Sequence, residues 1–506
     1  MRTEPIALPS KTLFQRPSPP GEPACGGLFI DGKWVEGDSG LAVRDKYTGE
    51  IIGSVSTAGP FQIEAALAAA RKAFPRYSAL PAHRRAAILL RASQLLASRR
   101  GPLADCIVRE SGKALKFAFL EVDRAVDTFR LASEEAGRIH GESVAMDAVR
   151  SGEGLIGFWR RRPVGVIAAI TPFNFPLNLV AHKVAPALAA GNTVVLKPSE
   201  LTPFTAAMLC EILAESGLPE GCFNLLHGEG GAVGDALVRD ARVDKVTFTG
   251  SAAVGAGILA TAGIKKVTLE LGNSSPVIIA ADADLALAAA KCAIGANYCS
   301  GQVCISTQRI LVERPVAGEF SRLLALETAK LVVGDPLRAD TDVGPMIHER
   351  AAQRVEDWIR EAVSEGARVT LGGRRECSVH WPTILEGVSP EMRIVREEVF
   401  GPVVSLLACR DFEAGLALAD ATPYGLQASV FTRDIDRAFR AADRLNFGGV
   451  IINDTPQLRP DHIPYGGTRQ SGLGREGLRF AIEEMTNIQM IMIRTPQGAP
   501  LQERTA

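Results

Sequence analysis

The sequence predicts an α/β protein built on open, largely parallel β-sheets, and three observations support this fold class. Short apolar runs alternate with longer helical patterns from residue 164 onward, as in strands joined by crossover helices. The first run, 164–170, is almost wholly apolar, as expected of a strand covered on both faces. The chain has 506 residues, more than one hydrophobic core usually holds, so two or three domains are expected.

Composition and charge narrow the range of partners. Apolar residues make up 46% of the chain and charged residues 22%, which are ordinary globular values. Lys and Arg number 56 against 57 Asp and Glu, so neither nucleic acid nor an anionic membrane is expected as a partner. No apolar run approaches the roughly 20 residues of a membrane span. The expected partner is a small molecule.

The cysteines indicate a reducing, cytoplasmic compartment. Nine of them are scattered along the chain and none is spaced C-x-x-C, which argues against a disulfide framework and against a zinc site. No metal is therefore expected. Residues 1–25 are rich in proline and lack an apolar core segment, so we interpret them as a flexible N-terminal arm rather than a signal peptide.

The first part of the chain is predicted to form a hairpin followed by four helices. The apolar residues at 28–30 and 34–35 flank a turn sequence, Asp31-Gly32-Lys33. Helical patterns follow from Gly59-Pro60 to Phe74, around 88–96, around 106–117 and at about 120–138. Arg130, on the fourth helix, is expected to lie on a solvated face.

The sheet pattern begins after a predicted strand at 154–159 and a basic run at 160–163. Strands are predicted at 164–170, 194–196, 223–226 and 245–248, with helices from Pro176 to a cap at Gly191 and from Pro203 to Ser216. This order predicts a nucleotide-binding sheet. The glycines after Leu226 miss the usual dinucleotide fingerprint, because Val233 stands where the third glycine should be, and we interpret them as a helix-entry loop.

A second strand–helix segment is predicted from Pro276 to about Thr432, and it includes a strand at 309–312. Near the end of the chain, 488–493 has the apolar pattern of an exposed edge strand. Such a strand favours pairing with another chain.

The stretch Asn297–Thr307 holds two cysteines among small and polar residues. A cysteine attacks carbon only as its thiolate, so a catalytic Cys304 needs an accessible setting that lowers its pKa. Gly301 would let the backbone approach a bound molecule closely. A free cysteine is more often a small buried hydrophobe, so the stretch alone leaves the role of Cys304 open. For Cys299 we favour packing over a second reactive thiol.

Six motifs carry a family resemblance. They are Thr171-Pro172-Phe173-Asn174-Phe175-Pro176, Lys197-Pro198-Ser199-Glu200, Phe248-Thr249-Gly250-Ser251 with Gly255, Glu270-Leu271-Gly272, Gly301-Gln302-Val303-Cys304 and Glu398-Val399-Phe400-Gly401-Pro402. In this order and spacing they resemble the aldehyde dehydrogenase superfamily over roughly residues 28–495, in particular its lactaldehyde, phosphonoacetaldehyde and non-phosphorylating glyceraldehyde-phosphate dehydrogenase-like members. The resemblance implies NAD(P)-dependent oxidation of an aldehyde to a carboxylic acid through a covalent thioester.

The resemblance also implies an architecture with a Rossmann-like cofactor domain, an α/β catalytic domain and a small β oligomerisation element. The NAD-binding domain would comprise 26–139 and 162–272, the catalytic domain 273–483, and the oligomerisation strands 140–161 and 484–497. The family usually forms dimers or tetramers by pairing such strands, so a homodimer or homotetramer is expected.

Three residues would carry the chemistry by this resemblance. Cys304 would attack the aldehyde carbon and give a thiohemiacetal, whose oxygen the Asn174 amide and the Cys304 backbone N–H would hold. Glu270 would activate the water that hydrolyses the thioester, and its apolar surroundings would raise its pKa. The alternatives are a turn residue for Asn174 and a solvated strand end for Glu270.

The implied cofactor is NAD, with NADP possible. Lys197 would hydrogen-bond the adenine ribose, and the nearby Glu200 would accept from a free 2′-hydroxyl and repel a 2′-phosphate. Glycines at a helix start would admit the pyrophosphate, and Glu398 would hold the nicotinamide ribose, whereas Glu397 is expected to be surface charge. The full set expected to bind the cofactor is Ile170, Thr171, Lys197, Ser199, Glu200, Gly230, Phe248, Gly250, Ser251, Gly255, Leu271, Glu398 and Phe400.

The substrate tunnel would be lined by Arg124, Phe175, Asn178, His182, Val303 and Arg459. Relatives that handle phosphorylated or phosphonate aldehydes often carry arginines at the positions of Arg124 and Arg459 and another just before the nucleophile, where this chain has Val303. Two guanidiniums can still grip a small anion. We therefore predict a short polar or anionic aldehyde, with a hydroxyaldehyde such as lactaldehyde next. Solvated charge remains the alternative for Arg124.

Two other functions stay open. A CoA-acylating dehydrogenase would pass the acyl group to CoA, and Glu270 speaks against it because that chemistry needs no water-activating base. A non-catalytic NAD-binding protein would have no need of Asn174, Glu270 and Cys304 together. The segments Pro464–Gly467 and Ser471–Gly477 also resemble the family, and we interpret them as structural, fixing loops near the tunnel mouth.

Overall fold

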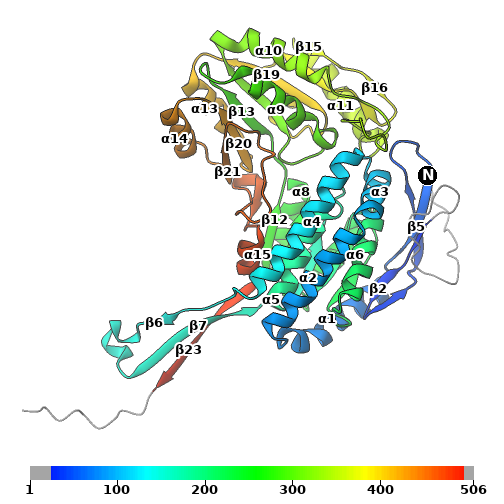
Figure 1. Cartoon of the computed structure of the whole chain (residues 1–506), viewed down its shortest axis with the longest axis vertical. Coiled ribbons are helices and arrows are strands. Elements are labelled where there is room, and N and C mark those ends of the chain that lie inside the picture. The colour runs from blue at the N-terminus through cyan, green and yellow to red at the C-terminus, as the bar shows by residue number, and fades with distance from the viewer. Residues whose placement is uncertain (1–23, 495–506) are drawn as a thin grey trace, which may run out of the picture.

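A computed structural model describes residues 24–494. Figure 1 shows a lobe rich in helices from the first half of the chain, a second α/β lobe from the later half, and a long β arm that projects away from both. The predicted N-terminal arm, 1–25, lies outside the described residues except for its last two positions. The end of the predicted C-terminal oligomerisation strand, 495–497, lies outside them as well.

The first lobe is built on an eight-stranded sheet in the order β22-β12-β11-β8-β9-β10-β2-β3. Its five central strands run parallel, and short antiparallel strands flank them. The central strands are β8 (Val166–Ile170), β9 (Thr193–Lys197), β10 (Phe223–Leu225), β11 (Lys245–Thr249) and β12 (Lys266–Glu270); the flanking strands are β2 (Leu28–Ile30), β3 (Lys33–Val35) and β22 (Gly472–Leu473).

Helices cover both faces of this sheet. Every residue of β8 is buried, and its side chains alternate between two hydrophobic cores, with Ile167 and Ala169 in one and Val166, Ala168 and Ile170 in the other. The first core is shared with α2 (Ala82–Ser98), α3 (Arg100–Ser111), α4 (Leu115–Ala136), α5 (Asn178–Ala190) and α6 (Phe204–Glu215), and the second with α1 (Pro60–Ser78), α7 (Asp235–Arg239) and α8 (Ala252–Thr261). The prediction of a doubly covered parallel sheet is confirmed.

Several helix boundaries differ from the prediction by a few residues, and the clearest difference lies after Ser111. The sequence predicted one helix around 106–117, but α3 ends at Ser111, because Gly112 takes up a left-handed conformation with φ of 76° that ends the helix. The next helix, α4, therefore begins at Leu115, earlier than expected. Gly191 caps α5 with φ of 91°, as predicted.

The second lobe holds a seven-stranded sheet in the order β15-β18-β19-β14-β13-β20-β21, parallel except for β15. Its strands are β13 (Ser275–Ile279), β14 (Thr307–Glu313), β15 (Arg368–Leu371), β18 (Thr383–Glu386), β19 (Val403–Cys409), β20 (Gln427–Phe431) and β21 (Gly449–Ile452). Its main helices are α9 (Leu285–Asn297), α10 (Arg314–Thr328), α11 (Glu349–Ser364), α13 (Phe412–Asp420) and α14 (Ile435–Arg444). The sequence located this segment and its strand at 309–312.

The β arm consists of β6 (Ser143–Val144), β7 (Leu155–Pro163) and β23 (Thr486–Arg494), in the order β23-β7-β6. β7 continues through the basic run that was expected to follow it, because each of those arginines pairs with a residue of β23. β23 is an edge strand, as predicted, and it exposes apolar side chains such as Ile488 and Met492. Such an edge is suited to pairing with another chain.

Candidate active site

A cavity of about 660 Å³ opens where strand ends of the first lobe meet the loop that follows α9. It brings together many of the residues that the sequence predicted for the site. Those in its walls are Arg124, Asn174, Phe175, Asn178, Gly250, Ser251, Glu270, Leu271, Val303, Cys304, Glu398, Phe400 and Arg459. The predicted residues outside its walls are Ile170, Thr171, His182, Lys197, Ser199, Glu200, Gly230, Phe248 and Gly255.

Backbone geometry positions the loop that carries Cys304. Cys299, Ser300 and Gly301 follow one another in the left-handed region, with φ of 50°, 55° and 69°. A Cβ at Gly301 would lie 2.0 Å from the carbonyl oxygen of Gly401, so only glycine fits there. The Ser300 hydroxyl donates to the carbonyl of Gly344 over 2.8 Å. The loop thus packs closely on Gly401 and is hydrogen-bonded to Gly344, and Cys299 is buried in packing, as expected.

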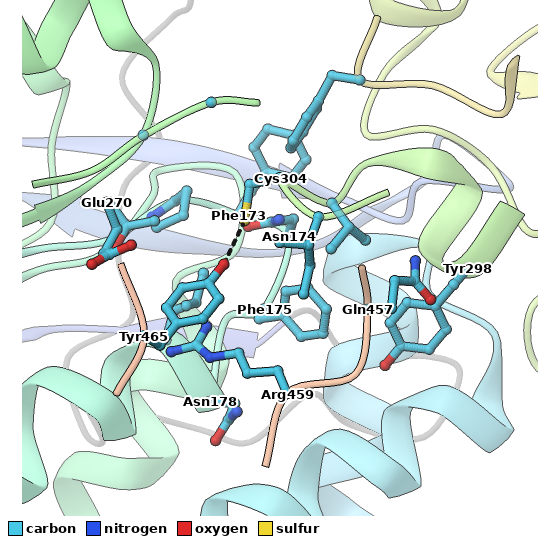
Figure 2. Close-up of a pocket in the computed structure, with 18 of the residues that line it drawn as sticks. Phe173, Asn174, Phe175, Asn178, Glu270, Tyr298, Cys304, Gln457, Arg459 and Tyr465 are labelled. Carbon is cyan, nitrogen blue, oxygen red and sulfur yellow. Dashed lines mark hydrogen bonds between the residues drawn. The ribbon is translucent and has the colours of Figure 1, made fainter. Parts of the chain in front are cut away.

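The groups around the Cys304 thiol shift its pKa in opposite directions. Its Sγ is 3.4 Å from the Tyr465 hydroxyl, a contact drawn in Figure 2. Burial raises the pKa of Cys304 to about 11, and the carboxyls of Glu398 and Glu270 add to this, whereas the Tyr465 hydrogen bond and the Arg459 charge lower it. The thiol keeps its proton until a bound group or a proton acceptor changes this balance.

Asn174 lies just past the end of β8, as the sequence predicted, and it is buried. Its Nδ2 donates to the carbonyl of Gln302 over 2.8 Å, which ties this loop to the one that carries the cysteine. Its Oδ1 has no hydrogen-bond partner among the described residues. Figure 2 shows the Asn174 amide beside Cys304. The amide can therefore reach an oxygen on the carbon attacked by the thiol, since it has a second N–H.

Glu270 ends β12 and is 3% exposed. Both of its carboxyl oxygens are buried without a hydrogen-bond partner in the described part of the chain. Burial raises its pKa well above the usual value, and the nearby Glu476 raises it further, against the opposing charges of Arg459 and Lys183. A buried, unpaired carboxyl with a raised pKa is suited to take up and return a proton.

One end of the cavity has features that fit a dinucleotide. Ser251 caps α8, its side chain accepts from the backbone N–H of Val254, and Gly250 and Ser251 line the cavity at this helix start. Glu398 accepts from the Asn273 N–H over 3.1 Å, and burial raises its pKa to about 7. A Cβ at Gly272 would lie 2.3 Å from Glu398, so glycine permits this approach.

The predicted adenosine end lies along the same sheet edge, beyond the cavity. Lys197, at the end of β9, is 3% exposed and forms an ion pair with Glu200 over 2.9 Å. The Thr171 hydroxyl, at the end of β8, is buried without a partner among the described residues. Gly230 opens a short helical turn that leads into α7, as expected of a helix-entry loop. An orphaned hydroxyl and a buried lysine at adjacent strand ends suit a polar ligand.

At the other end of the cavity both predicted arginines are present, and each already has a carboxylate partner. Arg124 bonds Asp461 through two nitrogens, at 2.6 and 3.1 Å, and its side chain is 29% exposed. Arg459 bonds Glu476 over 2.8 Å and is 7% exposed. Its Nε is buried and lacks a hydrogen-bond partner among the residues described. Glu476 is bonded to Lys183 as well, so Arg459 shares its carboxylate with a second buried cation.

His182 does not line the cavity as expected. It lies one turn further along α5 than Asn178, and its ring is buried 2.9 Å from Asp461. Burial and the Arg459 charge lower its pKa. Its place in this structure is behind Arg124, where it orients the carboxylate that holds that arginine.

Sequence reasoning missed several residues of the site. Tyr465 was interpreted as structural, yet its hydroxyl reaches the thiol. Glu476 and Lys183 form a buried ion pair at 2.8 Å beneath the cavity; Glu476 lies in the segment 471–477 that was interpreted as structural, and no motif pointed to Lys183. Tyr298 and Gln457 also line the walls. An aromatic hydroxyl next to Gly466-Gly467 was the one available signal, because a glycine pair lets other groups approach closely.

Between residues 24 and 494 there is no group of three or more His, Cys, Asp and Glu side chains that could hold a metal ion. Over the same range no helix is both long and apolar enough to cross a membrane.

Fold and cavity together define the class of protein. On one side, the ends of the parallel strands carry a helix start, a buried lysine and a buried hydroxyl without a hydrogen-bond partner among the described residues. On the other side, a thiol and an unpaired buried carboxyl line the same cavity. This is the arrangement of a dinucleotide-dependent oxidoreductase that uses a cysteine.

The chain belongs to the aldehyde dehydrogenase family, whose model matches residues 34–491. It is thus an oxidoreductase that acts on aldehyde groups with NAD(P), and the resemblance drawn from the motifs is confirmed.

Two relatives align along nearly the whole chain. A 3-sulfolactaldehyde dehydrogenase from Priestia aryabhattai is 43% identical over 467 residues, which cover 92% of this chain and 98% of the relative. A lactaldehyde dehydrogenase from Methanococcus aeolicus is 39% identical over 472 residues, covering 92% of this chain and 100% of the relative.

Three solved structures share the fold. Aldehyde dehydrogenase 21 from Physcomitrella patens, in complex with the reaction product succinate, has a TM-score of 0.90 and 39% identity, covering 92% of this chain and 98% of its own. A glyceraldehyde-3-phosphate dehydrogenase from Methanocaldococcus jannaschii, complexed with NADP, has a TM-score of 0.87 and 38% identity, covering 90% and 99%. A betaine aldehyde dehydrogenase from Staphylococcus aureus, in complex with NAD+, has a TM-score of 0.90 and 33% identity, covering 94% and 96%.

Proposed function

We propose that this aldehyde dehydrogenase oxidises a short anionic aldehyde, with Cys304 as nucleophile, Asn174 as oxyanion holder and Glu270 as the base. One observation carries the anionic substrate: the guanidinium of Arg459 lines the cavity, and it shares its carboxylate partner, Glu476, with the buried Lys183. Arg124 lines the same wall. One carboxylate between two buried cations leaves positive charge uncompensated, and a substrate anion would balance it.

The chemistry follows from the placement of these side chains. Cys304, once deprotonated, attacks the aldehyde carbon, and the free N–H of Asn174 together with the Cys304 backbone N–H holds the resulting oxygen. NAD, held by residues such as Gly250, Ser251 and Glu398, would supply the hydride acceptor at this point. The thioester left on Cys304 is then hydrolysed by water whose proton goes to Glu270, since this carboxylate has no other bonding partner in the described chain.

The relatives' names support an anionic substrate. Sulfolactaldehyde, named for the Priestia aryabhattai protein, carries a sulfonate, and succinate, bound in the Physcomitrella patens protein, is a dicarboxylate. In each, an anionic group lies a few bonds from the aldehyde carbon or the carboxyl carbon formed from it, and Arg124 and Arg459 would face such a group in this chain. Lactaldehyde, the neutral hydroxyaldehyde named for the Methanococcus aeolicus protein, remains the second candidate.

NAD is the cofactor that we propose, with NADP possible. Lys197 would bond the adenine ribose, while the carboxylate of Glu200, 2.9 Å from Lys197, would accept from a 2′-hydroxyl and repel a 2′-phosphate. Gly250 and Ser251 would meet the pyrophosphate at the start of α8, and Glu398 the nicotinamide ribose. Both cofactors occur in structures of the relatives.

The domain division predicted from the sequence, a homodimer or homotetramer paired through the β arm, and a cytoplasmic location are part of the same proposal. The apolar edge strand β23 supports pairing between copies of the chain. The scattered cysteines, which lie without disulfides in the described residues, fit a reducing compartment.

The proposal is tested by comparing kcat/KM for anionic and neutral aldehydes of equal length, such as succinic semialdehyde and pentanal, by NADH formation without CoA. We expect the anionic substrate to be preferred by at least about tenfold. The variant Arg124→Gln should lose about tenfold on the anionic aldehyde and little on the neutral one. Arg130→Gln is a matched control, because Arg130 lies on the same helix with its side chain 45% exposed and paired with Asp127 and Glu134.

Two outcomes would contradict the proposal. If the neutral aldehyde were turned over faster than the anionic one, and if Arg124→Gln left both rates unchanged, the substrate would not be an anionic aldehyde. Strict dependence on CoA, with full turnover in Glu270→Gln, would favour the CoA-acylating alternative.

A further inference from the structure

We propose that the Tyr465 hydroxyl donates a hydrogen bond to the Cys304 thiolate, which makes Tyr465 a catalytic residue that activates the nucleophile. The inference rests on the proposed role of Cys304. The two side chains are in contact, with Tyr465 Oη 3.4 Å from Cys304 Sγ, as Figure 2 shows. Tyr465 is 3% exposed, and its hydroxyl makes no other hydrogen bond to a described residue.

The buried Tyr465 hydroxyl is stabilised only when it forms a hydrogen bond. A phenylalanine would fill the same space, whereas burying a hydroxyl without a partner costs free energy. A thiol and a phenol can each donate to the other, but a thiolate can only accept. Once the thiol proton has left, the contact therefore has one possible direction, from Tyr465 to the sulfur, and a hydrogen bond to an anion is the stronger kind.

Neighbouring residues hold the ring of Tyr465 in the orientation that points its hydroxyl at Cys304. One face lies on the guanidinium of Arg459, whose Cζ is 3.4 Å from the ring centroid. The Tyr465 backbone pairs with that of Glu476 through two hydrogen bonds, of 3.1 and 2.7 Å. Glu476 in turn bonds Arg459 through its side chain. One residue thus fixes both the backbone of the tyrosine and the cation under its ring.

The charges around the pair support the same direction. Arg459 faces both side chains, Glu270 and Glu398 face the thiol, and Lys183 and Glu476 lie behind Arg459. Burial raises the pKa of Tyr465, so the phenol keeps its proton and acts as a donor rather than a base. The two carboxyls oppose a thiolate, and the hydroxyl and guanidinium are the groups that favour it.

The test uses Tyr465→Phe, which keeps the ring on Arg459 and removes one oxygen. The rate of alkylation of Cys304 by iodoacetamide is measured against pH, by mass spectrometry of the peptide that carries it. We expect the midpoint to rise by about one pH unit and the rate at pH 7 to fall about tenfold, because a hydrogen bond to a charged group is worth on the order of one pKa unit or more. Tyr298→Phe, which also removes a hydroxyl from the cavity wall, should leave the midpoint unchanged.

Activity gives the second measurement. The kcat/KM of Tyr465→Phe should fall at neutral pH and recover toward the parent value as pH rises, since more thiolate forms without help. A loss that is equal at every pH would indicate a packing role and overturn the inference. So would an unchanged alkylation midpoint. Either result leaves the proposed function standing as long as Cys304→Ser is inactive, whereas full turnover by Cys304→Ser would remove the nucleophile itself.

Discussion

Glu270 and Glu476 are both buried beside the same cavity, yet their surroundings are opposite. Glu476 bonds Lys183 and Arg459, each at 2.8 Å, and these cations lower its pKa. Glu270 has no hydrogen-bond partner among the described residues, and burial raises its pKa. The ionised Glu476 adds to that rise. Hydrogen-bond and ion-pair partners therefore decide whether a buried carboxyl stabilises the fold or remains free for proton transfer.

The largest expected effect that separates the two carboxyls is on turnover. Glu270→Gln should lower kcat by about three orders of magnitude, because general-base catalysis contributes on the order of 10² to 10⁴. Its free energy of unfolding should change by less than about 1 kcal/mol, since no hydrogen bond is lost. Steady-state NADH formation and a single-turnover burst measure the first, and the burst should persist because hydride transfer precedes hydrolysis.

Glu397→Gln is the control for that variant. Glu397 lies on the surface as predicted, its side chain 45% exposed, and the substitution should leave kcat as in the parent. If Glu270→Gln were fully active, or equally weakened in the burst and in steady state, Glu270 would not be the hydrolytic base.

The second effect is on stability and concerns the paired carboxyl. Glu476→Gln should lower the free energy of unfolding by about 3 kcal/mol, because it leaves Lys183 and Arg459 buried with less compensation. Denaturant unfolding measures the loss. Glu483→Gln, in the nearby α15 (Leu478–Glu484), removes a carboxylate that is 37% exposed and should cost less than about 0.5 kcal/mol. Equal losses in the two variants would show that the buried pair adds no special stability.

The smallest effect is in the pH dependence of stability, where the two carboxyls have opposite signs. The folded pKa of Glu476 is lowered, so its contribution is present above the unfolded value of about 4.3 and is lost as pH falls below it. The folded pKa of Glu270 is raised, so its contribution is present below about pH 4.3 and is lost as pH rises toward the folded value.

Unfolding of the two glutamine variants at pH 4 and pH 7.5 measures these signs. The deficit of Glu476→Gln against the parent should shrink at pH 4, and any advantage of Glu270→Gln should be greatest at pH 7.5. Each slope is limited to about 1.4 kcal/mol per pH unit, the value for one proton. Parallel profiles for both variants would mean that the two environments are alike.

Much of the fold could be predicted because its signals are local. The buried strand β8 shows an apolar run, and the end of α5 shows Gly191. Two boundaries were wrong. Gly112 divides α3 from α4 inside an otherwise helical pattern. β7 continues through three arginines because the distant strand β23 pairs with them. A pairing partner so distant in the chain leaves no trace in the strand's own composition.

The site could be predicted in part, for a related reason. Cys304, Glu270 and Asn174 stand in short motifs and meet at one cavity. Tyr465 and Glu476 stand in segments that were interpreted as structural, and Lys183 stands in no motif, because their roles depend on contacts between parts of the chain that are far apart in sequence. His182 was assigned to the tunnel by resemblance. The structure shows that it lies one helical turn beyond Asn178 on α5, where it bonds Asp461 and does not line the cavity.

The backbone contact between Gly301 and Gly401 has a consequence for how such an enzyme can diverge. It joins the loop of the thiol to the segment that carries Glu398 and Phe400, main chain against main chain. The distance between the reacting sulfur and the cofactor end is therefore set without help from the tunnel side chains. Residues such as Arg124, Val303 and Gln457 line the cavity without forming this contact, so substitutions there should change which aldehyde binds while the loop of the thiol keeps its place.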